Sequence, residues 1–249
     1  MHKPKSLILH LAQEHRKGPL AEYLKEIIYG GNDGIVTTFA VVSGFSGASL
    51  NVNDLTTLSF LTVLLFGFAN LMADGLSMGL GNYLATRSEK EIYEKDKEKE
   101  MKEIMENPDL EAEETISILQ AKGFSQEDAR TLVNIYKKNS KYWVDWMMSH
   151  ELEAPNPEST NPVLTSISTF FAFVIFGAIP LLPYIFFQGG ALQAFLISAF
   201  ATLLALVLLG LLKGVVIGGK IFRSVREIVL IGGISALVAF LVGTFFKGI

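Results

Sequence analysis

Residues 190–212 read GALQAFLISAFATLLALVLLGLL and contain no charged side chain. A stretch of this length can cross a bilayer core as one helix, which takes about 20 residues. Four further stretches share this character and contain only two charged residues, Asp33 and Asp74: 27–50, 55–84, 163–187 and 228–246. The chain of 249 residues is therefore predicted to be an all-α integral membrane protein with five transmembrane helices.

Charged residues are concentrated between the second and third apolar stretches. Residues 85–162 hold 29 of the 46 charged side chains, 11 basic and 18 acidic. Such a segment does not belong in the hydrocarbon core, where each charge costs at least about 2.5 kcal/mol. We predict four parts: a cytoplasmic N-terminal segment, 1–26; transmembrane helices one and two, 27–84; an inserted cytoplasmic helical domain, 85–162; and transmembrane helices three to five, 163–249.

The basic residues indicate an orientation. Of the 21 Lys and Arg residues, 20 fall on one side of the predicted bilayer, and only Lys247 falls on the other. By the positive-inside rule, the N-terminus and the segment 85–162 face the cytoplasm and the C-terminus lies outside. No organelle-targeting extension precedes the first span, so we expect the plasma membrane of a prokaryotic cell. The net charge of −4 argues against nucleic acid as the main partner.

A helix break inside the insertion is predicted to bring carboxylates together. The helix that leaves the second span should end at Asn107-Pro108, because Pro disfavours helix in the residue before it. Glu100 and Glu103 share one face of that helix, and Glu111 and Glu114 share a face of the next. A hairpin at the break could place both pairs at one point, where four carboxylates repel one another unless a cation lies between them.

The last helix of the insertion, about 140–152, offers sulfur ligands. Met147 and Met148 precede Glu151 by four and three residues, so thioether and carboxylate share a face. Oxygen ligands suit Mg²⁺, Ca²⁺ or Mn²⁺, and added thioether favours a softer ion such as Fe²⁺. The chain has no Cys, which excludes thiolate zinc sites. The alternative is a solvated Glu/Lys helix with both Met side chains in an apolar core.

Asp33 and Asp74 are candidates for an ion pathway through the spans. A carboxylate inside a bilayer is costly, so it usually faces a pathway or a partner. At 1.5 Å per residue, Asp33 and Met78 are each predicted about 9 Å from the cytoplasmic edge. Asp74 falls near the midplane, with Asn70 a further turn out. The sequence GGNDG of Gly30–Gly34 is expected to loosen the first helix and free its carbonyl groups for an ion. The alternative is that both Asp residues are protonated and structural.

The sequence resembles the vacuolar iron transporter family over nearly the whole chain from about residue 25. Five stretches carry the resemblance, in the same order: IIYGGNDGIVTTFAVVSGFSGA (27–48), ADGLSMGLGNYLATRSE (73–89), ENPDLEAEE (106–114), WVDWMMSHELE (143–153) and FGAIPLLPYIFF (176–187). The resemblance implies five spans, a cytoplasmic metal-binding domain between spans two and three, and a homodimer with the ion path along the subunit interface.

The resemblance also implies a function. Members exchange Fe²⁺, and often Mn²⁺, for protons and move the metal out of the cytoplasm for detoxification or storage, with no enzymatic activity and no permanently bound cofactor. The implied metal ligands of the domain are Glu100, Glu103, Glu111, Glu114, Met147, Met148 and Glu151, and the implied pathway residues are Asp33 and Met78. Plant-type members have a glutamate where this chain has Asn70 and a small residue where it has Asp74. We therefore expect Asp74 to replace that carboxylate.

Two other classes of protein stay open. A membrane-anchored metal sensor or scaffold without transport would need the carboxylates of the insertion but no polar line through the spans. An intramembrane enzyme of the aspartyl type would need Asp33 and Asp74 to share a proton at a separation of about 3 Å. Only an antiporter would give a metal flux that follows a pH gradient.

Overall fold

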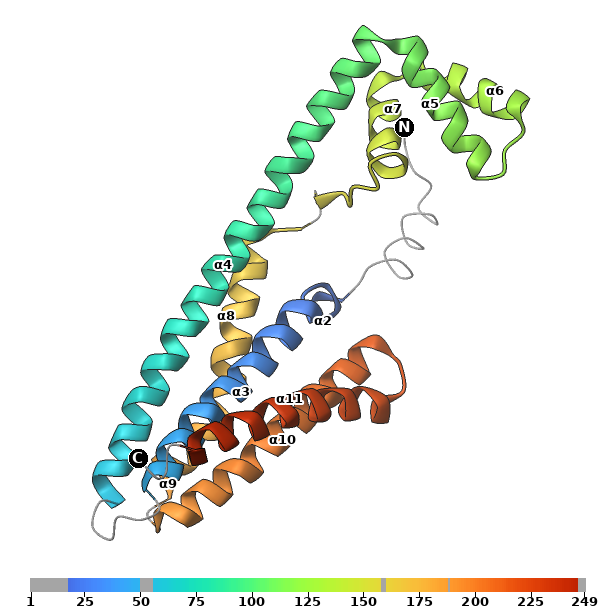
Figure 1. Cartoon of the computed structure of the whole chain (residues 1–249). Coiled ribbons are helices and arrows are strands. Elements are labelled where there is room, and N and C mark those ends of the chain that lie inside the picture. The colour runs from blue at the N-terminus through green and yellow to red at the C-terminus, as the bar shows by residue number, and fades with distance from the viewer. Residues whose placement is uncertain (1–17, 50–55, 158–159, 188, 246–249) are drawn as a thin grey trace, which may run out of the picture. The chain divides into compact units, whose positions relative to one another are not determined.

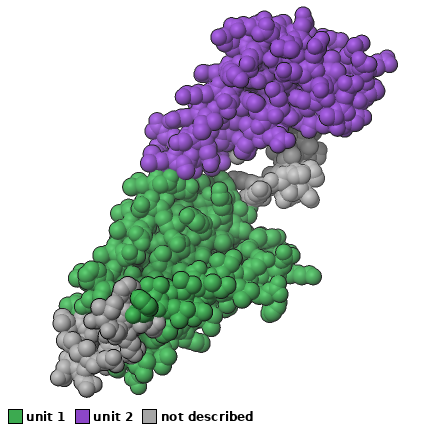
Figure 2. Space-filling view, in the orientation of Figure 1, with its two compact units in different colours: residues 1–82, 163–249 green, residues 83–162 purple. Residues whose placement is uncertain are grey.

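The computed structural model describes residues 18–49, 56–157, 160–187 and 189–245. Within these ranges every regular element is a helix (Figure 1). The chain divides into two compact units, shown in Figure 2: unit 1 comprises residues 1–82 and 163–249, and unit 2 comprises residues 83–162. Most of the predicted N-terminal segment 1–26, the connection 50–55 and Lys247 lie outside the described residues.

The helices follow in chain order. They are α2 (Pro19–Glu22), α3 (Leu24–Ser49), α4 (Thr56–Glu106), α5 (Pro108–Ala121), α6 (Gln126–Tyr136), α7 (Ser140–His150), α8 (Pro162–Ala178), the 3-10 helix η2 (Ile179–Leu181), α9 (Leu182–Phe186), α10 (Ala191–Ile217) and α11 (Ile221–Phe245). The third predicted span is thus divided by η2, because Pro180 has no backbone N–H to continue the α-helical ladder.

Four helical segments in the described part of the chain are long and apolar enough to cross a membrane: Phe60–Glu106, Pro162–Phe186, Ala191–Ile217 and Ile221–Val242. In the first of these, the apolar residues end near residue 84, and 14 charged residues follow between 85 and 106. The charged part therefore lies beyond the membrane-spanning segment. The remaining predicted span forms α3, whose apolar run is interrupted by Asn32 and Asp33, so the fifth crossing stays a prediction.

Unit 1 packs its helices closely through glycine. A Cβ atom added to Gly34 of α3 would clash with the backbone of Phe173 in α8, and one added to Gly30 would lie 2.6 Å from the carbonyl oxygen of Thr169. The helix α3 is continuous from Leu24 to Ser49. The expectation that Gly30–Gly34 loosens this helix is therefore wrong, because these glycines serve close helix packing instead. In the same unit, α3, α10 and α11 lie side by side (Figure 1).

Unit 2 confirms the predicted helix break. The α4 helix ends at Glu106, and Pro108 occupies the first turn of α5, where its missing N–H costs nothing. Ser125 caps α6 by accepting a hydrogen bond from the Asp128 backbone N–H at 3.1 Å. A core that includes Trp143, Val144 and Leu119 lies among the four helical segments.

Candidate functional site

Three carboxylates meet in unit 2. Glu100 comes from the charged part of α4, Glu111 from the first turn of α5, and Glu151 from the C-cap of α7. One oxygen atom of each lies within 4.8 Å of the other two. The helix break at Asn107-Pro108 allows this approach, because the chain turns back there between Glu100 and Glu111. Three acidic groups from three helices thus converge on a volume that can hold one ion.

Burial makes this cluster unfavourable for ionised carboxylates alone. Glu100 is 3% exposed and Glu111 is 5% exposed, while Glu151 remains open to solvent. Burial and the negative charges of the neighbouring glutamates raise the pKa of Glu100 to about 7. Burial likewise raises the pKa of Glu111 and of Glu151. The Oε1 atom of Glu100 is buried and makes no hydrogen bond with the described residues. A proton or a cation would relieve this arrangement.

Glu103 and Glu114 lie beside the cluster rather than within its closest group. Their charges act on Glu100, Glu111 and Glu151. The Glu103 carboxylate also lies 3.5 Å from the Lys99 ammonium nitrogen. The structure therefore brings three of the five predicted carboxylates into direct reach of one ion, with the other two contributing negative potential around them.

Met147 and Met148 are fully buried on α7, within the core of unit 2. The Met147 sulfur lies 3.2 Å from the hydroxyl oxygen of Thr115. That hydroxyl accepts a hydrogen bond from the indole N–H of Trp143 at 2.8 Å and lies 2.7 Å from the carbonyl oxygen of Glu111. These contacts connect the sulfur to the helix that carries Glu111. Both methionines are part of the apolar packing, and their role as ligands stays a prediction.

The chemistry of this site suits a divalent cation. Carboxylate oxygens are the ligands preferred by hard and borderline divalent ions such as Mn²⁺, and a nearby thioether extends the range toward Fe²⁺. With a pKa of about 7, Glu100 is about half protonated at neutral pH, so a cation bound to its oxygen atoms would compete with a proton.

Asp33 and Asp74 lie near each other in unit 1. The negative charge of Asp74 on α4 acts on the carboxyl group of Asp33 on α3. Both side chains are partly buried. The backbone carbonyl of Asp33 accepts a hydrogen bond from the Thr37 hydroxyl at 2.9 Å, so it is engaged within its own helix. The electrostatic effect of Asp74 is the observation that links these two carboxyl groups, and their sharing of one pathway stays a prediction.

Met78 and Asn70 are placed differently from the two aspartates. Met78 is partly buried and packs against an apolar cluster that includes Leu71 and Phe173. Asn70 lines a hollow of about 620 Å³ between α3 and α4, whose other lining residues are apolar. The continuity of the four predicted pathway residues along one conduit stays a prediction.

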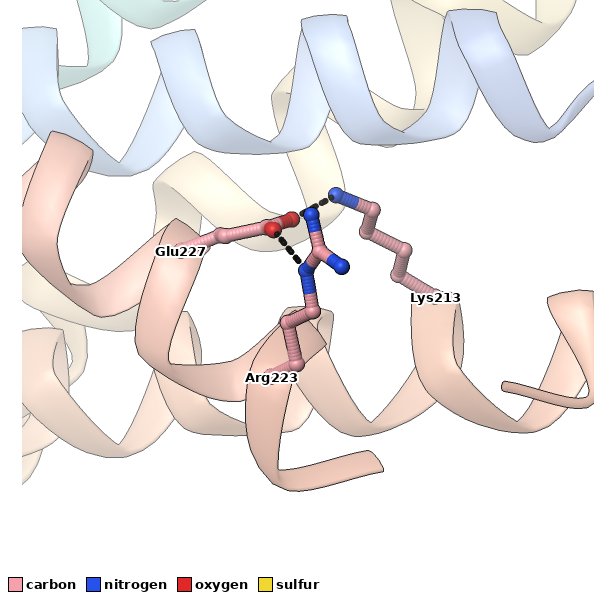
Figure 3. Close-up of polar contacts among 3 residues, drawn as sticks. All are labelled: Lys213, Arg223 and Glu227. Atoms are coloured by element: carbon pink, nitrogen blue, oxygen red, sulfur yellow. Dashed lines mark hydrogen bonds and ion pairs between the residues drawn. The ribbon is translucent and has the colours of Figure 1, made fainter. Parts of the chain in front are cut away.

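A further group of charges was not singled out from the sequence. Glu227 of α11 accepts hydrogen bonds at 2.9 Å from the Lys213 ammonium of α10 and from Arg223 one turn earlier on α11 (Figure 3). Glu227 is the only acidic residue in 163–249, and its spacing of four residues from Arg223 is the signal that could have revealed half of this cluster. The contact with Lys213 depends on how α10 and α11 pack.

Comparisons with known proteins match stretches of the chain that extend over both units. A family model described as "VIT family" matches residues 24–244. The chain is 34% identical to Vacuolar iron transporter 1 of Eucalyptus grandis, covering 92% of this chain and 90% of the relative. It is 34% identical to Vacuolar iron transporter 1 of Arabidopsis thaliana, covering 94% and 90%. A Vacuolar iron transporter of Toxoplasma gondii is also 34% identical, covering 93% and 77%.

Proposed function

Because the chain belongs to the VIT family, we propose that it is a membrane transporter of divalent transition-metal cations, Fe²⁺ and also Mn²⁺, in exchange for protons. The named relatives are iron transporters rather than enzymes, which supports transport over catalysis. The transported ion is substrate here, and no resident cofactor is needed.

The observation that carries the proposal is the convergence of Glu100, Glu111 and Glu151 within 4.8 Å. Three carboxylates at this separation repel one another, and two of them are buried. A divalent cation removes the repulsion, and loss of the cation returns protons to the same oxygens. Unit 2 would thus capture metal and concentrate it, with Glu103, Glu114, Met147 and Met148 supporting the site.

The proposed route through the membrane uses Asp33 and Asp74, with Met78 and Asn70 along it. The electrostatic interaction between the two aspartates supports a shared ion or proton site. Asp74 would serve where plant-type members have a glutamate. A homodimer, as the family resemblance implies, would place this route at the subunit interface.

The proposed direction is export from the cytoplasm, for detoxification or storage. The distribution of Lys and Arg supports it, because the positive-inside rule favours a cytoplasmic N-terminus and unit 2 and an outer C-terminus, so that unit 2 would capture metal on the cytoplasmic side. In the plasma membrane of a prokaryotic cell this direction would be efflux.

The full-length protein in proteoliposomes tests the proposal. A metal-quenched dye and a pH-sensitive dye are enclosed, and Fe²⁺ under reducing conditions or Mn²⁺ is added outside. We expect metal flux to follow an imposed pH gradient and proton flux to follow a metal gradient. Glu100→Gln should lower flux at low metal concentration, whereas Glu98→Gln, an exposed carboxylate two residues earlier, should not.

A sensor or scaffold gives a different result in the same vesicles. It would bind metal with the same dependence on Glu100, measured by calorimetry, but it would give no flux in any gradient. Metal binding without flux would therefore overturn the transporter in favour of the membrane-anchored sensor.

A further inference from the structure

A cavity of about 630 Å³ lies in unit 1 between the start of α3, the end of α10 and the start of α11. Its apolar wall includes Ile28, Ile217, Ile228 and Ile231. Lys25 and Lys213 line it as well, from α3 and α10 respectively. The volume is within the range of ligand pockets, which hold about 300–1,000 Å³. The cavity therefore combines an apolar channel with two ammonium groups.

The ionisable residues that line this cavity balance in charge, Lys25 and Lys213 against Asp33 and Glu227, and Arg223, which pairs with Glu227 without lining the cavity, adds one positive charge beside it. Glu227, which also lines it, is shared by Lys213 and Arg223, so two cations face one carboxylate (Figure 3). Lys25 adds a further positive charge from α3. Asp33 follows Lys25 by about two turns of the continuous helix α3, so its carboxylate is carried about 12 Å further along the helix axis than the Lys25 ammonium group. An anionic group is thus favoured at the lysine end.

The surroundings of the cavity favour a lipid over a water-soluble anion. Tyr29 is 64% exposed, Ile217 58% and Ile231 60%, and all three line the cavity. Large apolar side chains that are exposed beside lysines are unfavourable in water but suit the boundary between headgroups and acyl chains. Basic pockets between transmembrane helices bind the headgroups of anionic lipids by this combination of contacts.

We propose that this cavity binds one anionic phospholipid of the surrounding bilayer. The phosphate is held by the ammonium groups of Lys25 and Lys213, and an acyl chain lies against Ile28, Ile217, Ile228 and Ile231. Lys213 can bind the phosphate and Glu227 together, because an ammonium group has three N–H donors. The lipid would thereby connect α3 to the α10–α11 pair.

Lipid retention by the full-length protein tests this proposal without any transport assay. Purified protein in mild detergent is titrated with phosphatidylglycerol or phosphatidylcholine, and bound lipid is counted by native mass spectrometry. We expect phosphatidylglycerol to bind at least about fivefold more tightly than phosphatidylcholine, because one lysine near an anionic headgroup raises the affinity by about that factor. Lys25→Gln should remove about fivefold of that affinity, and Lys220→Gln, the same change outside the cavity, should leave it unchanged.

A second matched pair tests the acyl-chain wall. Ile231 and Ile234 are 60% and 62% exposed on the same helix, but only Ile231 is among the residues that line the cavity. Ile231→Trp should fill the cavity and lower the retention of phosphatidylglycerol, whereas Ile234→Trp should leave it unchanged. Three results would overturn the proposal. They are equal binding of both lipids, an equal loss of phosphatidylglycerol affinity in all four variants, and unchanged phosphatidylglycerol retention in Lys25→Gln and Ile231→Trp. Equally tight binding of glycerol phosphate, which has no acyl chain, would also overturn it.

Discussion

The carboxyl group of Glu100 lies within 4.8 Å of that of Glu111, although the two residues belong to different helices separated by the break at Asn107-Pro108. Glu100 is buried, and its Oε1 atom makes no hydrogen bond with the described residues. Such a pair is unfavourable when both groups are ionised, so its occupancy by protons or metal should control both binding and stability of unit 2.

Metal affinity should depend on pH through Glu100. The pKa of this residue is raised to about 7, and its oxygens bind a cation only when deprotonated. Affinity for Mn²⁺ should therefore fall about tenfold between pH 8 and pH 6, as one proton comes to compete. Calorimetric titration of the full-length protein measures this. Glu98→Gln should keep the pH dependence, and Glu100→Gln should lose most of it; a wild-type affinity that is constant from pH 8 to pH 6 would contradict the assignment.

Stability without metal should show the opposite effect of pH. A carboxyl whose pKa is higher in the folded state than in the unfolded state favours folding at low pH, and this contribution is lost as pH rises through the folded value. In the presence of a chelator, Glu100→Gln should therefore raise the melting temperature at pH 8 by a few degrees and leave it nearly unchanged at pH 4. Added Mn²⁺ should stabilise the wild type at pH 8 more than this variant. Equal melting temperatures at pH 8 in chelator would argue against buried charge at this site.

Local features of the sequence predicted much of unit 2. Pro108 allows no helix to continue through Asn107, and Ser125 has the side chain that caps a helix, so both boundaries follow from single residues. The pairing of Glu100 with Glu111 follows from the same break. What distinguishes these two from Glu103 and Glu114 is burial, which depends on how α7 packs and has no signal in residue spacing.

Contacts between distant helices were harder to predict. Gly214 and Gly218 have the four-residue spacing that is typical of close helix packing, but Gly218 has a φ of +69° and ends α10 as a left-handed C-cap. Gly210 and Gly214 instead approach Val225 and Ile221 of α11. The cavity beside Lys213 likewise forms only when three helices assemble. From the sequence alone, a glycine can serve either close helix packing or a helix C-cap, and only the position of the neighbouring helix distinguishes the two roles.

Gly34 should tolerate no side chain. A Cβ atom there would clash with the backbone of Phe173, whereas one at Gly44, further along the same helix, would meet nothing within 4 Å. Gly34→Ala should therefore lower the free energy of unfolding by about 1–3 kcal/mol, the usual effect of overpacking. Gly44→Ala should be neutral or slightly stabilising, because alanine favours helix. Thermal unfolding in detergent measures both; equal melting temperatures would show that α3 and α8 are not in this contact.

The Thr115 hydroxyl should stabilise the core of unit 2. It accepts a hydrogen bond from the indole N–H of Trp143. Trp143 is 1% exposed, and its indole N–H loses this acceptor in Thr115→Val. The variant should cost about 1–3 kcal/mol, because the donor remains buried without an acceptor. Thr131→Val on α6 provides the control, since its hydroxyl is exposed and bonds only within its own helix at 2.9 Å. Near-UV circular dichroism of Trp during thermal unfolding measures the stability of both variants. Equal stability of Thr115→Val and Thr131→Val would exclude this hydrogen bond.

Asp74 should be required for transport but not for folding. Its carboxyl group acts electrostatically on Asp33, so Asp74→Asn removes a repulsion and should leave the protein folded, monodisperse and at least as thermally stable as the wild type. Metal flux in proteoliposomes should nevertheless fall to background, because the amide cannot exchange a proton and binds a divalent cation poorly. Metal binding by unit 2 should be unchanged in calorimetry, and Glu98→Gln should retain full flux. If Asp74→Asn transports metal at the wild-type rate with the same pH dependence, this residue does not replace the carboxylate that Asn70 lacks, and the proposed relay must pass through Asp33 without it.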